Sequence, residues 1–136
     1  GSHQIMEYRE SSYIPWGESQ EVVLADEEDH YDNGVENLKQ FAKDPKQLAD
    51  FQEVYDRVMP NALKRAFGRL EGPDNAFCLE HGLKRNSTEA IVNRYLNEMH
   101  GHMVGTGLMF PPMSAFEAIK CELADSTREI LLSLQR

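Results

Sequence analysis

The sequence lacks the long apolar run that would place it in a membrane. None of its apolar stretches approaches the roughly 18 residues that a membrane-spanning helix needs. Cysteine is scarce too: Cys78 and Cys121 are the only two, so the chain can form at most one disulfide. Cys78 lies in an apolar run and Cys121 in a predicted helix, which favours two reduced, buried thiols. We therefore expect a reducing compartment, either the cytoplasm or the interior of a host cell.

The chain also has no excess of basic residues. Its net charge is −9, and the whole imbalance lies in residues 1–36, where ten acidic side chains stand against Arg9 alone. Residues 37–136 hold thirteen acidic and thirteen basic side chains and are neutral. A neutral body argues against the strongly basic surface of a dedicated nucleic-acid-binding protein.

Signatures of common enzymes are missing as well. The sequence contains neither G-x-S-x-G nor H-E-x-x-H, and no pair of carboxylates stands out from ordinary solvated charge. These absences favour a non-catalytic protein that uses no cofactor.

The most unusual local composition is that of residues 100–113, which combine two histidines, three glycines and a Pro-Pro pair. The glycines lack the lysine and the Ser/Thr of a phosphate-binding loop, and no predicted strand precedes them. His100 and His102 could join Cys78 and His81 at a zinc ion, but this spacing matches no recognised zinc finger. We therefore interpret the segment as a connection between helices and expect no metal site.

The N-terminal quarter differs from the rest of the chain. Residues 1–3 resemble what a protease leaves after tag removal, and we set them aside. Residues 4–32 are interpreted as an extended acidic N-terminal arm, with one or two short strands at Ile5–Tyr8 and Glu21–Leu24. Its aromatic side chains and its acidic run are the expected partner-binding residues: Tyr8, Tyr13, Trp16, Asp26, Glu27, Glu28 and Asp29.

Residues 33–136 are predicted to form an all-α domain, a compact bundle of five to six helices. Apolar residues recur there at helical spacing. Signals for helix starts and ends stand at Asp44-Pro45, Gly82, Asn86–Glu89 and Ser114–Glu117. Pro60 is expected to kink or end the helix that begins at Pro45. The capping box at 114–117 is expected to open one long final helix.

The segment Arg94-Tyr-Leu-Asn-Glu-Met-His100 resembles the R-x(4–6)-H motif of HEPN-type ribonucleases, which are small helical proteins. The resemblance covers these seven residues. It implies a metal-independent cleavage of RNA in which Arg94 and His100 are the catalytic pair and two subunits complete the site. Tyr95 departs from the family, which usually carries a polar residue beside the arginine.

A helix-turn-helix is a second alternative. Residues 76–82 and the helix that follows Asn86 are separated by a short turn with basic residues. In such a motif Asn93, Arg94 and Asn97 would read base edges in the DNA major groove. Glu89 and Glu98 on the same helix, together with the acidic net charge, weigh against this interpretation.

Basic residues of the body gather at Arg57, Lys64, Arg65, Arg69, Lys84 and Arg85. They form either an ordinary solvated surface or a basic face that receives the acidic run of residues 26–32, from the same chain or from another. The function that the sequence favours is a non-catalytic protein–protein interaction module of the inhibitor, immunity or adaptor type. Its expected partner is a protein with a basic surface, and the sequence leaves a homodimer open.

Overall fold

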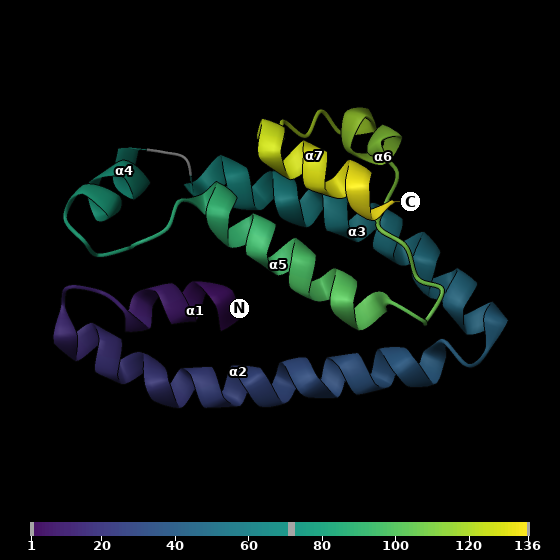
Figure 1. The fold of residues 1–136 in the computed structure, drawn as a ribbon, viewed down its shortest axis with the longest axis horizontal. Coiled ribbons are helices and arrows are strands. Elements are labelled where there is room, and N and C mark those ends of the chain that lie inside the picture. Colours follow the sequence, from purple (N-terminus) through teal and green to yellow (C-terminus); the bar gives the residue numbers. More distant parts are fainter. Residues whose placement is uncertain (1, 71–72, 136) are drawn as a thin grey trace.

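The computed structural model describes residues 2–70 and 73–135, and side chains within 5–67 and 73–135. Within these ranges the chain forms seven helices and no strand, so the predicted all-α class is confirmed. The helices are α1 (Ser2–Arg9), α2 (Ile14–Phe41), α3 (Pro45–Leu70), α4 (Pro73–Glu80), α5 (Thr88–Met103), α6 (Met113–Ala118) and α7 (Asp125–Leu134) (Figure 1). None of them, over the described residues, combines the length and hydrophobicity needed to cross a membrane.

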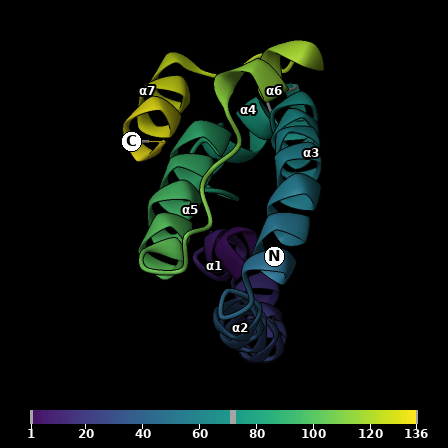
Figure 2. The same cartoon turned by 90° about the vertical axis from the view of Figure 1, so that its right-hand side faces the viewer.

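The helices are arranged around α5. The short helix α1 folds back along α2 and lies between α2 and α5, as both ribbon views show (Figures 1 and 2). On its other sides α5 packs against α7 and α3, and α6 packs against α3. Helix α4 stands apart from this group, close to the turn between α1 and α2 (Figure 1).

The hydrophobic core lies where α3, α5, α6 and α7 meet. Leu96 and Leu131 are fully buried and Phe116 is almost so. Burying one such side chain stabilises the fold by about 1.5–3 kcal/mol. Helix α2 contributes to this core with Leu38, near its C-terminal end, so the N-terminal half of α2 lies beyond it.

The N-terminal segment is helical, which corrects the expected extended conformation. Both predicted strands lie inside helices, Ile5–Tyr8 in α1 and Glu21–Leu24 in α2. Helix α2 is amphipathic over a long distance, because its buried residues recur at helical spacing: Gly17, Leu24, Val35 and Leu38. Contact with α1 and α5 favours the helical conformation over the strands that the short apolar runs suggested. Helix α2 also continues without a break past residue 33.

The predicted start of α3 is confirmed, whereas Pro60 does not end the helix. The Oδ1 atom of Asp44 accepts a hydrogen bond from the Lys46 N–H at 2.9 Å, and the helix begins at Pro45. A proline inside a helix removes one backbone hydrogen bond. The helix nevertheless runs on to Leu70, because Met59 and Leu63 on either side of the proline are buried in the core.

The final helix is broken in two, which corrects the expectation of one long helix. Residues 119–124 separate α6 from α7, and Lys120 there adopts a φ of +51°. Helix α6 begins after Pro112, so Ser114 lies inside the helix and does not cap it. Phe116 on α6 and Leu131 on α7, on either side of the break, both lie in the core.

Candidate functional site

A pocket of about 300 Å³ opens where the turn between α1 and α2 meets α4. The N-terminal segment contributes Tyr8, Ser11, Tyr13 and Trp16 to its lining; α4 and the following turn contribute Asp74, Asn75, Cys78, Leu83 and Lys84. The lining is mainly apolar. An apolar pocket with a few polar groups at fixed positions is the usual form of a binding site.

Three aromatic side chains shape one wall of this pocket. The rings of Tyr8 and Trp16 meet edge to face, with their centroids 5.6 Å apart. Tyr13 and Trp16 remain 57% and 49% exposed. Aromatic residues that stay exposed around a hollow are typical of surfaces that bind another molecule. The structure thus brings together all three aromatic residues that the sequence predicted as partner-binding.

Lys84 is the buried charged group of the pocket. Its side chain is turned inward, and the residue is only 8% exposed. The Nζ atom donates a hydrogen bond to Asn75 Oδ1 at 3.0 Å and lies 5.7 Å from the centre of the Tyr8 ring. Among the described residues no carboxylate forms an ion pair with Lys84. Within the described part of the chain, the groups that face its positive charge are therefore a neutral amide and an aromatic ring.

The backbone around Gly82 holds Lys84 in place. Gly82 has a φ of +70°, and Leu83 N–H binds the Cys78 carbonyl at 2.8 Å, which ends α4 in a Schellman turn as the glycine predicted. The α1–α2 turn binds this end of α4 through Ser12, whose N–H donates to the Gly82 carbonyl at 2.9 Å. The Ser12 hydroxyl donates to the His81 carbonyl at 3.1 Å. These bonds fix the two sides of the pocket relative to each other.

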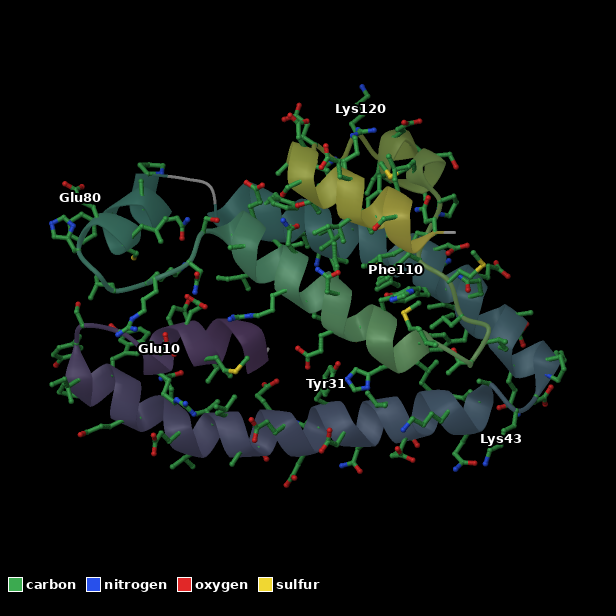
Figure 3. The ribbon with its side chains drawn as sticks, in the orientation of Figure 1. Glu10, Tyr31, Lys43, Glu80, Phe110 and Lys120 are labelled. Carbon is green, nitrogen blue, oxygen red and sulfur yellow. The ribbon has the colours of Figure 1, made fainter. Side chains whose placement is uncertain are left out.

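Arg85 and Asn86, which follow Lys84 in the chain, attach the N-terminal segment to the start of α5. The Glu7 carboxylate, only 3% exposed, accepts hydrogen bonds from the backbone and side-chain N–H groups of Asn86 and from Arg94 at 3.1 Å. Arg85 donates to the Glu10 carbonyl at 3.1 Å and pairs with its carboxylate at 3.6 Å. Glu10 marks the turn between α1 and α2 (Figure 3). The three consecutive residues 84–86 therefore each contact the N-terminal segment and hold it in place.

The predicted acidic residues lie outside the pocket. Asp26, Glu28 and Asp29 are exposed on α2, and Glu27 is half-buried. Asp26 pairs with His30 one turn further on, at 3.8 Å. No ion pair among the described residues joins this run to a basic residue of the body. The acidic run is therefore a largely exposed surface on α2, outside the lining of the pocket.

The predicted basic residues fall into two groups. Lys84 and Arg85 lie at the pocket and the α1–α2 turn. Arg57, Lys64 and Arg65 are exposed on α3, where Lys64 donates a hydrogen bond to the Ile119 carbonyl. The side chain of Arg69 lies outside the described residues.

The two residues of the ribonuclease resemblance have separate partners. Arg94 is paired with the buried carboxylate of Glu7. His100 stacks near Phe110, with 6.4 Å between the ring centres. Six positions along a helix correspond to a difference of about 120° around its axis. The structure therefore does not bring Arg94 and His100 together into one site.

The helix proposed to read DNA is only partly covered: Asn93 contacts α7, whereas Arg94 and Asn97 are exposed. The Asn93 side chain donates to the Ser126 hydroxyl at 2.6 Å and accepts from the Thr127 hydroxyl at 2.7 Å, both on α7. Asn97 donates to the Asn93 carbonyl. Helix α5 is packed against α1, α3 and α7, so this arrangement gives no support to a recognition helix lying in a groove.

The histidines and cysteines are dispersed. His81 stacks on Phe77 at 4.0 Å, and His102 lies against Tyr31 at 5.3 Å. Both cysteines are free thiols, and burial raises the pKa of Cys121. In the part of the chain that the structure describes, no group of three or more histidine, cysteine or acidic residues could hold a metal ion.

Two features of the site were not predicted from sequence. One is the carboxylate of Glu7, and the other is the burial of Lys84 beside Asn75; both depend on contacts between distant segments. No protein-family model matches the chain, and no curated protein or solved structure shows significant similarity to it.

Proposed function

We propose that the protein is a non-catalytic interaction module that binds a partner protein by taking one of its apolar side chains into the aromatic pocket. One observation carries this proposal: Tyr8, Tyr13 and Trp16 converge with α4 on a single pocket while Tyr13 and Trp16 stay about half exposed. Tyrosine and tryptophan in such positions supply large contact areas at little entropic cost, and they dominate the energy of many protein interfaces.

The acidic surface of α2 supports a partner that carries basic residues near its apolar anchor. Helix α2 holds eight carboxylates and one lysine, Lys39. The first of these carboxylates, Glu18, follows Trp16 by two residues, and Asp29 lies about 20 Å from Trp16 along the helix. Opposite charge on a partner would speed association and restrict which partners bind.

The type of protein that we propose is an inhibitor, immunity protein or adaptor that covers a basic surface of another protein. The two free thiols support a reducing compartment, and we place the protein in the cytoplasm of its source or host cell. The bonds that fix the pocket walls also support binding without a large rearrangement, since a preorganised site loses little entropy when it is filled.

The proposal is tested by affinity capture from an extract of the source organism. The immobilised proteins are the unaltered chain, the double variant Tyr13→Ala/Trp16→Ala, and the control Val22→Ala, which shortens an exposed apolar side chain on α2 away from the pocket lining. We expect the unaltered chain and the control to retain the same partner and the pocket variant to lose it, with identical helical circular dichroism. Equal retention by all three proteins would refute the pocket as the binding site.

A further inference from the structure

We infer that the pocket recognises a carboxylate that adjoins an apolar side chain, as at the free C-terminus of a protein chain that ends in leucine or phenylalanine. Lys84 is the residue that binds the carboxylate, and Tyr8, Tyr13 and Trp16 surround the apolar group. This inference rests on the proposed function, because it specifies the chemistry of the group that enters the same pocket.

The unbalanced charge of Lys84 is the first observation behind this inference. An ammonium group has three hydrogen-bond donors, and among the residues that the structure describes this one has a single hydrogen-bond acceptor, Asn75. Burial of a charge without an opposite charge is unfavourable, and a ligand carboxylate would remove that penalty. The neighbours of the ammonium, Asn75 and Tyr8, both line the pocket, so a ligand inside it can reach Nζ.

The same geometry argues against a cationic ligand. Three aromatic side chains could form a cage for a quaternary ammonium group. Here the Lys84 ammonium already lies over the Tyr8 ring, and a second cation next to it would be repelled. Asp74, the carboxylate that lines the pocket, is exposed and forms no ion pair with Lys84, so solvent screens its effect on an entering anion.

A chain end fits the pocket better than an internal acidic residue. At a C-terminus the carboxylate and the last side chain leave the same carbon atom, so both can enter a pocket of about 300 Å³. An internal acidic residue would also bring the backbone on both of its sides to the pocket. The residues before the chain end would leave the pocket beside Trp16, where the acidic surface of α2 favours lysine and arginine. A small organic acid shares this chemistry, and the experiment below separates the two sources.

Binding can be followed by intrinsic fluorescence, because Trp16 is the only tryptophan and lines the pocket. The probes are N-acetyl-phenylalanine, its amide, and a heptapeptide with three lysines and a C-terminal phenylalanine, as free acid and as C-terminal amide. We expect each acid to bind about tenfold more tightly than its amide. We expect the peptide acid to bind more tightly than N-acetyl-phenylalanine, because its lysines meet the acidic surface of α2.

The variant Lys84→Met keeps the length and the apolar stem of the side chain but removes its charge. We expect it to bind acid and amide alike, while Lys43→Met, on the exposed turn between α2 and α3, keeps the preference for the acid. Circular dichroism verifies that both variants are folded. The acid–amide ratio of the unaltered protein tests the inference even if Lys84→Met fails to fold.

The other outcomes contradict the inference in different ways. Equal binding of acid and amide to the unaltered protein overturns carboxylate recognition. It does not contradict the proposal that the pocket takes an apolar side chain of the partner. Equal binding of N-acetyl-phenylalanine and the peptide acid overturns the chain end as the source and indicates a small carboxylic acid. If no probe binds, carboxylate recognition fails; the proposed function fails with it only if the pocket double variant still captures the partner.

Discussion

Glu7 and Asn86 are 79 positions apart in the sequence, yet each carboxylate oxygen of Glu7 accepts a hydrogen bond from Asn86. Oε2 binds the backbone N–H at 3.0 Å, and Oε1 binds the side-chain amide at 2.7 Å. Oε1 also accepts from Arg94 on α5. This buried contact joins α1 to the start of α5 and thereby orients the segment that carries the aromatic residues of the pocket.

The variant Glu7→Gln should destabilise the protein by about 1–3 kcal/mol, because an amide replaces one acceptor oxygen by a donor and leaves Arg94 without its charge partner. Urea unfolding followed by circular dichroism measures the change. Glu10→Gln is the matched control: its ion pair with Arg85 is exposed, and we expect a change below about 1 kcal/mol. Equal unfolding midpoints for the two variants would contradict the role assigned to Glu7.

The variant Gly17→Ala should loosen the contact between α1 and α2. A Cβ atom at residue 17 would lie 2.6 Å from the Arg9 carbonyl oxygen, which no ordinary contact allows. The helices must shift apart, at a cost of about 1–3 kcal/mol. Gly34→Ala on the same helix has no atom within 4 Å of its new Cβ, so it should be neutral or stabilise α2 by up to about 1 kcal/mol. Thermal unfolding of the two variants compares them directly, and a Gly17→Ala protein as stable as the unaltered chain would count against the close contact.

Loss of either exposed aromatic ring should weaken partner binding strongly. We expect Trp16→Ala or Tyr13→Ala to raise Kd about 30-fold, the effect of a residue at the energetic centre of an interface. Val22→Ala should change Kd less than about twofold, since surface positions outside the contact contribute little. Titration calorimetry with the captured partner gives these values. Affinity should also fall as salt is added, because we propose that basic residues of the partner face the carboxylates of α2.

Tyr31 makes the stability of the folded protein depend on pH in alkaline solution. It points from α2 toward α5 (Figure 3), and burial, followed by the nearby charge of Glu98, raises its pKa from 10.0 to about 12. Because the folded state holds the proton more tightly than the unfolded state, this stabilising contribution is complete below pH 10 and is lost as the pH rises toward about 12. The variant Tyr31→Phe should therefore lose less stability over this range than the unaltered protein.

Urea unfolding at several alkaline pH values measures this difference. Tyrosine ultraviolet difference spectra of the two proteins should also diverge near pH 12. A Tyr31 that ionises at its ordinary pKa in the folded protein would contradict the burial of its hydroxyl against α5.

The fold was predictable where the signals are local. The start of α3 follows from Asp44 and Pro45 alone, and the end of α4 from Gly82, since capping and left-handed turns depend on neighbouring residues. The helical state of residues 14–32 was not predictable in this way. Between its buried positions Gly17 and Leu24 no residue is buried, and the contacts of α1 with this helix are ones that no local pattern contains.

The site was predictable only in part, for the same reason. Tyr8, Tyr13 and Trp16 stood out as aromatic residues in a charged segment, and they do meet in one pocket. Lys84 was grouped with the exposed basic residues, because nothing in its neighbourhood in the sequence indicates that Asn75 and Tyr8 enclose it. Burial of a charged side chain is a property of tertiary packing.

The most direct test of the pocket is a backbone amide NMR titration of the protein with the lysine-containing heptapeptide that ends in phenylalanine. We expect the largest shifts on the lining of the pocket, at Tyr13, Trp16, Asn75 and Lys84, with smaller shifts along the acidic surface of α2. Shifts that cluster instead at Phe51, Val54 and Val58, whose apolar side chains are exposed on α3, with no shift at the pocket, would contradict binding at the pocket.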